Sequence, residues 1–178
     1  MPLPNDLLDQ AFHLAGREPK KPRQASLRRA VSAAYYALFH LLTAEGAKRL
    51  SPAKPKGLRP LIQRAYNHGD MRNVCVSVAA GQRSFLKSGL SGQNPSPTHQ
   101  LLSFPLDTAL FDVIEAFLLL QAARNDADYN LNTQLSRTEV LRRVEDARQA
   151  LADWASIRAT PNATVFLSAL LPQRHWGR

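Results

Sequence analysis

The residue types best suited to chemistry occur in two stretches of this sequence, 26–50 and 106–130, whose apolar residues recur at helical spacing. The second stretch ends in Arg124-Asn125-Asp126-Ala127-Asp128-Tyr129, and the first carries Arg28, Arg29, Tyr35, Tyr36 and His40. Metal-free cleavage of RNA needs a group that activates the ribose 2′-OH, a cation for the phosphate and an acid for the leaving oxygen. Histidine, arginine and tyrosine could supply these three roles.

The second stretch directs a charged pair toward the core. At about 100° per residue, Arg124 and Asp128 fall on the same helical stripe as the apolar residue Phe117. An arginine that faces the interior must be paired, because an isolated buried charge costs several kcal/mol. The first stretch offers side chains that could meet it: Arg29, Tyr36 and His40 share one helical line, and Arg28 and Tyr35 share a neighbouring one.

Two interpretations of this cluster remain open. In a catalytic one, the histidine, arginine and tyrosine side chains of the cluster supply the three roles. In a structural one, Asp128 neutralises Arg124 at i+4 and a tyrosine satisfies the remaining donors. Spacing alone favours the structural interpretation.

The composition narrows the classes of function. The chain has 178 residues, enough for one helical core, and a formal net charge of +9. That charge favours a polyanionic partner, nucleic acid before an anionic membrane surface. Cys75 is the single cysteine, so no internal disulfide can form.

Several reaction classes lack their motifs. The sequence has no Gly-rich phosphate loop, no paired Cys or Cys/His zinc spacing and no His-Glu-x-x-His. The five histidines do not occur at ligand spacing, so we predict no metal and no cofactor. The most apolar span, 109–123, contains Asp112 and Glu115 and falls short of the roughly 20 residues of a membrane helix. Because the first residues lack a signal-peptide pattern, we expect a cytoplasmic protein without a membrane partner.

The remaining pattern predicts only helices. Besides 26–50 and 106–130, we expect helices over 6–16, 56–67, 71–86 and 137–158, and a last short one from Asn162. Asn5 or Asp6, Ser26 and Ser136 are the expected N-caps, the last in a capping box with Glu139. Residues 68–70 read as a turn and 88–99 as a loop. We therefore predict an all-α, single-domain helical bundle over 1–158, followed by a short helix and a basic tail over 159–178.

Two segments together resemble the HEPN-domain family. They are the helix Ser26-Leu27-Arg28-Arg29-Ala30-Val31-Ser32-Ala33-Ala34-Tyr35-Tyr36-Ala37-Leu38-Phe39-His40 and the helix end Arg124-Asn125-Asp126-Ala127-Asp128-Tyr129, within a resemblance over about residues 5–155. The resemblance implies a helical bundle that forms a homodimer, with the arginine motifs of both chains facing one cleft. Many such proteins are RNA-cleaving toxins or effectors, often paired with a nucleotidyltransferase-like antitoxin. Active members carry a histidine shortly after the motif arginine, where this chain has Asp128-Tyr129-Asn130-Leu131.

The resemblance implies residue roles that we test as two hypotheses. In the first, the protein binds RNA at a homodimer cleft and acts as a metal-independent endoribonuclease or toxin component. Its catalytic residues are then Arg124, Asp128, Tyr129 and His40, and its RNA-binding residues are Arg28, Arg29, Tyr36 and Asn125. In the second, the protein is a non-catalytic binding or assembly module whose partner is another protein, such as a nucleotidyltransferase-like antitoxin.

Overall fold

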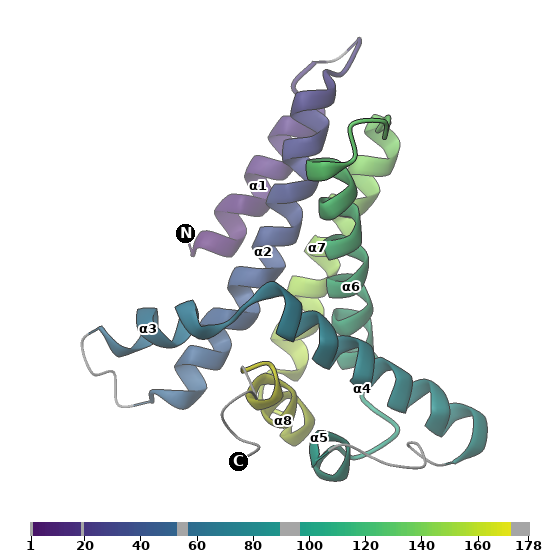
Figure 1. Cartoon of the computed structure of the whole chain (residues 1–178). Helices are drawn as coiled ribbons and strands as arrows, with labels where there is room; N and C mark the ends of the chain where they lie inside the picture. The colour runs from purple at the N-terminus through teal and green to yellow at the C-terminus, as the bar shows by residue number, and fades with distance from the viewer. Residues whose placement is uncertain (1, 19, 53–56, 90–96, 172–178) are drawn as a thin grey trace. The chain divides into compact units, whose positions relative to one another are not determined.

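Every regular element in the described part of the chain is an α-helix, which confirms the all-α prediction there (Figure 1). The computed structural model describes residues 2–18, 20–52, 57–89 and 97–171. The helices are α1 (Leu3–Gly16), α2 (Gln24–Leu50), α3 (Leu58–Ala65), α4 (His68–Ser88), α5 (Pro97–Leu101), α6 (Thr108–Tyr129), α7 (Arg137–Ile157) and α8 (Pro161–Ala169). None of these described helices is both long and apolar enough to cross a membrane.

The chain divides into two compact units. The first contains Met1–Leu41 and Ala116–Ala152, and the second contains Leu42–Glu115 and Asp153–Arg178. Helices α2, α6 and α7 each contribute residues to both units.

The first unit is built from α1, the first part of α2, the end of α6 and most of α7. Its core consists of fully or almost fully buried residues: Ala11, Leu27, Ala30, Ala34, Tyr35, Leu38, Phe117, Leu120, Val140, Val144 and Ala147. The Gln24 side chain fastens the start of α2 to the segment before α7, since its amide donates to the Leu135 carbonyl (2.8 Å) and accepts from the Leu135 N–H (2.9 Å). Burial of these apolar side chains stabilises the unit.

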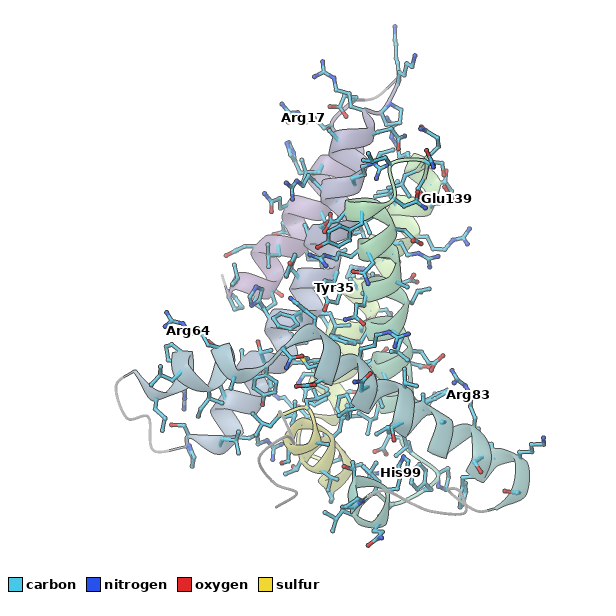
Figure 2. All side chains as sticks on the ribbon, in the orientation of Figure 1. Arg17, Tyr35, Arg64, Arg83, His99 and Glu139 are labelled. Carbon is cyan, nitrogen blue, oxygen red and sulfur yellow. The ribbon has the colours of Figure 1, made fainter. Side chains whose placement is uncertain are left out.

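The predicted capping box at the start of α7 is confirmed. The Glu139 N–H donates to Ser136 Oγ (3.2 Å), and the Ser136 N–H donates to Glu139 Oε2 (3.0 Å). Glu139 therefore marks the N-terminal end of α7 in Figure 2. Both donors would otherwise be unsatisfied at a helix start.

The second unit has its own core and its own polar links. Its buried side chains include Leu42, Met71, Cys75, Val78, Leu110, Ile114, Trp154, Phe166, Leu167 and Leu170. The Asn162 amide connects α8 to the segment after α5, because it accepts from the Ser103 N–H and donates to the Ser103 carbonyl, both at 2.9 Å. His99 on α5, labelled in Figure 2, lies against α4 with its Nε2 2.9 Å from the Ser77 carbonyl oxygen.

Two expected N-caps in the first unit are wrong. Helix α1 begins at Leu3 after Pro2, so neither Asn5 nor Asp6 caps it; proline in a first turn lacks only an N–H that has no helical partner. Helix α2 begins at Gln24, before Ser26, whose hydroxyl instead donates to Glu18 Oε1 (2.9 Å). Ser26 is therefore the third residue of α2 and lies inside its first turn, not at the N-cap position.

The second unit also corrects the expected boundaries. Residues 68–70 are the first turn of α4 rather than a turn between helices, because Asn67 accepts from the Asp70 N–H (2.8 Å) and caps the helix. Thr160, not Asn162, caps α8, because α8 begins at Pro161 and the Thr160 hydroxyl accepts from the Ala163 N–H (3.2 Å). The C-terminal part of the expected 88–99 loop is helical in α5, whereas 90–96 and the basic tail over 172–178 lie outside the described residues.

Candidate functional site

The floor of the candidate site is an aromatic cluster in the first unit. Tyr35 on α2 and Phe117 on α6 have no exposed surface, and their ring centroids lie 5.6 Å apart. Tyr35 also packs against Tyr36, with centroids 5.4 Å apart. These contacts place α2 against the end of α6 and leave Tyr36, one residue further along, partly exposed.

Arg124 is the centre of the site. Its Nε lies 2.7 Å from Asp128 Oδ2, and its Nη2 donates to the Tyr36 hydroxyl (3.3 Å). Its guanidinium carbon lies 5.7 Å from the ring centroid of Tyr36 and 5.4 Å from that of Tyr129, both within cation–π range. Nη1 donates to Asn125 Oδ1 (3.2 Å). The arginine is thus oriented from several sides, as predicted for a charge directed toward the interior.

The ion pair is shielded from water and held by a hydroxyl. The side chains of Arg124 and Asp128 are 17% and 22% exposed, and Asp128 Oδ1 accepts from Ser32 Oγ (2.7 Å). Burial opposes the charge of Arg124, but Tyr36, Asp128 and Tyr129 outweigh it and raise the pKa of the guanidinium. Arg124 is therefore a permanently charged group with fixed geometry.

His40 extends the site by one helical turn along α2. Its ring stacks on that of Tyr36 with centroids 6.0 Å apart and an interplanar angle of 27°. Burial lowers the pKa of His40 below its usual value of 6.5. The imidazole is consequently neutral at pH 7 and can accept a proton, as a general base must.

Arg28 and Arg29, adjacent in sequence, have different environments. Arg28 Nη1 donates to the carbonyls of Ala127 (2.5 Å) and Asn130 (3.1 Å), and its Nη2 donates to that of Thr133 (2.6 Å). These carbonyls lie at and beyond the C-terminal end of α6, where helix carbonyls lack helical partners. Arg29 is exposed and has no hydrogen-bond or ion-pair partner among the described residues.

The predicted site residues divide into two groups. Tyr36, Asn125, Asp128 and Tyr129 all contact Arg124, and His40 reaches the cluster through Tyr36. Arg28 and Arg29 do not contact Arg124 in any described interaction. Arg28 instead donates to carbonyls at the C-terminal end of α6, and Arg29 is exposed to solvent.

Ser32 is a site residue that sequence reasoning missed. It lies one helical turn before Tyr36, on the same side of the helix as Tyr36 and His40. That position was the available signal, because a small hydroxyl on this side can only be satisfied by the facing helix or by its own backbone. Ser32 uses both, donating to Asp128 and lying 3.2 Å from the Arg28 carbonyl oxygen.

Comparisons with known proteins add no relative. No protein-family model matches the sequence, and neither a curated protein nor a solved structure matches it significantly. Within the described ranges, no group of three His, Cys, Asp or Glu side chains is placed to hold a metal ion. The site is therefore interpreted from its own geometry.

Proposed function

We propose that the protein is a HEPN-like, RNA-associated homodimer whose RNA-contacting surface is the cluster of Tyr36, His40, Arg124, Asn125 and Tyr129. The observation that carries the proposal is the guanidinium of Arg124, which lies within cation–π range of the rings of Tyr36 and Tyr129 and is oriented by Asp128. A fixed guanidinium next to an aromatic ring suits a nucleotide, because the cation contacts the phosphate while a base stacks on the ring.

Tyr129 is the platform in this proposal. Tyr129 is 73% exposed. Apart from its cation–π contact with Arg124, it contributes little to the core. Arg29, exposed on α2, would add a phosphate contact. The net charge of +9 supports association with a polyanion.

The cluster also supports a route for metal-independent cleavage. Neutral His40 would remove the proton from the ribose 2′-OH, whose oxygen then attacks phosphorus. Arg124 would stabilise the charge on the phosphate oxygens, and Tyr36 or Tyr129 would donate a proton to the leaving 5′ oxygen. The lowered pKa of His40 supports the first role and the raised pKa of Arg124 the second.

Fluorescence anisotropy with a labelled single-stranded RNA tests the binding proposal. Tyr129→Ala should weaken binding by roughly 5- to 150-fold, the effect of losing one stacked base, without lowering the melting temperature. Arg148→Gln is the charge control, because Arg148 pairs with Glu145 on the exposed face of α7, and both side chains belong to exposed residues. The affinity of the wild type for RNA should fall steeply between about 50 and 200 mM salt, because each phosphate contact releases counterions on binding. Equal affinities of wild type and Tyr129→Ala would refute the surface assignment.

Cleavage is tested separately. Wild type, Arg124→Gln and His40→Gln are incubated with total RNA and tRNA in EDTA, and the products are resolved by gel electrophoresis. The proposal predicts fragments with the wild type and intact RNA with both variants. Intact RNA with all three proteins, together with RNA binding, would remove the catalytic part and leave the binding part standing.

A second candidate function is a non-catalytic assembly module, and one observation favours it. Asp128 already neutralises Arg124, and two exposed apolar residues follow, Tyr129 at 73% and Leu131 at 84%. This surface suits a partner protein, either a second copy or a nucleotidyltransferase-like antitoxin. Sedimentation of wild type and Leu131→Asp distinguishes the candidates: a dimer that dissociates on substitution, with no RNA binding in the wild type, would favour the assembly module.

A further inference from the structure

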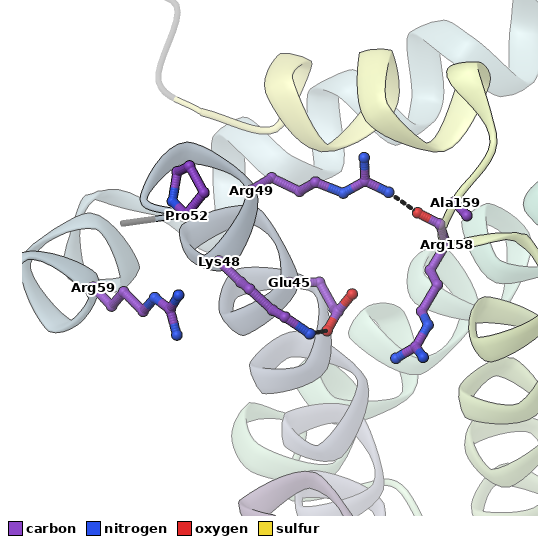
Figure 3. A pocket seen from close by; sticks show the side chains of 7 residues that line it. All are labelled: Glu45, Lys48, Arg49, Pro52, Arg59, Arg158 and Ala159. Atoms are coloured by element: carbon purple, nitrogen blue, oxygen red, sulfur yellow. Dashed lines mark hydrogen bonds and ion pairs between the residues drawn. The ribbon is translucent and has the colours of Figure 1, made fainter. Parts of the chain in front are cut away.

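A basic pocket lies in the second unit, and none of its lining residues belongs to the Arg124 cluster. It has a volume of about 500 Å³ and lies between the end of α2, the start of α3 and the segment that follows α7 (Figure 3). Its charged lining residues are Lys48, Arg49, Arg59, Arg158 and Glu45. Four cations thus line the pocket with one carboxylate. The cations repel one another, and their combined positive charge attracts an anion.

Two of the arginines tie the walls of the pocket together. Arg49 donates to Thr164 Oγ1 (2.9 Å) and to the Arg158 carbonyl, which fixes the end of α2 to the α7–α8 connection. Arg59 donates from Nε (3.2 Å) and Nη2 (3.0 Å) to the Ser51 carbonyl. Each guanidinium has five N–H donors, so both retain donors for a ligand after holding the wall.

Arg158 and Lys48 are less constrained. Figure 3 shows the Arg158 side chain extending toward Glu45 and Lys48, and its guanidinium has no hydrogen-bond or ion-pair partner in the described part of the chain. Lys48 Nζ lies 3.9 Å from Glu45 Oε1, a long contact that leaves its other donors open. These two cations have no structural task comparable to those of Arg49 and Arg59.

We propose that this pocket binds the phosphate or pyrophosphate group of a small ligand. Guanidinium forks match the spacing of phosphate oxygens and bind them with paired charge-assisted hydrogen bonds. The volume falls within the range of small-molecule sites, which suits a compact anion. Glu45 weakens the binding of any anion and so limits the pocket to multiply charged ones.

Calorimetric titration of the full chain with inorganic pyrophosphate and with inorganic phosphate tests the proposal. Pyrophosphate should bind more tightly than phosphate, and Arg158→Gln should weaken it by roughly tenfold or more. Glu45→Gln should tighten it. The matched control is Arg72→Gln, which removes an exposed α4 arginine of the same unit that has no described partner.

The melting temperature without ligand separates a binding role from a structural one. Arg158→Gln should melt at the wild-type temperature or above, because it relieves repulsion and breaks no hydrogen bond or ion pair of the guanidinium with the described residues. Pyrophosphate should then stabilise wild type but not this variant. The proposal would be overturned if millimolar pyrophosphate produced no heat of binding, or if Arg72→Gln lost as much affinity for pyrophosphate as Arg158→Gln. Displacement of bound pyrophosphate by single-stranded RNA would overturn the small-ligand assignment in favour of nucleic acid. None of these outcomes depends on the Arg124 cluster.

Discussion

Asp128→Asn isolates the contribution of the ion pair to stability. The amide keeps the shape of the carboxylate and can still accept from Ser32, but Arg124 loses its counter-charge. Exposed ion pairs contribute about 0–1 kcal/mol, and breaking a fully buried pair costs about 3–5 kcal/mol. With side chains 17% and 22% exposed, this pair lies between the two cases, so we expect a loss of about 2 kcal/mol in the free energy of unfolding.

That loss corresponds to a fall of about 4–8 °C in melting temperature for a chain of this size. Urea denaturation followed by circular dichroism gives the free energies for wild type, Asp128→Asn, Arg124→Gln and the double variant. The coupling energy of this cycle should exceed about 1 kcal/mol and persist at high salt, because shielded pairs are screened weakly.

The control is Glu145→Gln, which changes the net charge by the same amount and breaks the ion pair with Arg148. This pair is exposed, because the side chains of Arg148 and Glu145 are 54% and 51% exposed. Its melting temperature should equal that of the wild type. Additive effects within about 0.5 kcal/mol for Arg124 and Asp128 would refute the inference that their pair is coupled, and with it the fixed orientation of the guanidinium.

Three further predictions concern both units. Arg28→Gln should lower the free energy of unfolding by about 1–3 kcal/mol, because it leaves the carbonyls at the end of α6 without their donor. Arg29→Gln, at an exposed position, should leave the free energy of unfolding unchanged, and urea denaturation of the two variants compares them directly. Because burial lowers the pKa of His40, the unfolded chain binds more protons, so stability should fall as pH drops from 6.5 toward the folded-state pKa, and His40→Gln should flatten that fall. Gly46→Ala should destabilise by about 1–3 kcal/mol, since its Cβ would lie 2.0 Å from the buried Tyr66 hydroxyl; Tyr66→Phe should relieve part of that loss, and thermal melts of the single and double variants measure it.

Local relations were predictable from the sequence. The 3.6-residue period of apolar side chains indicated helices throughout, and the Ser136–Glu139 box marked the start of α7 correctly. The pairing of Arg124 with Asp128 followed from their i, i+4 spacing on one helix face. Such features depend on neighbours within one or two turns, so the order of residues suffices to predict them.

Contacts between distant segments were decided by the tertiary structure. The hydrogen bond from Ser32 to Asp128 joins residues that are 96 positions apart. Arg28 bonds to the end of α6 while its neighbour Arg29 is exposed, and this difference depends on which side of α2 packs on α6. Periodicity defines the faces of a helix but does not say which element covers each face. The basic pocket joins segments around Glu45 and Arg158 that share no pattern, and it exists only because helix packing brings them together.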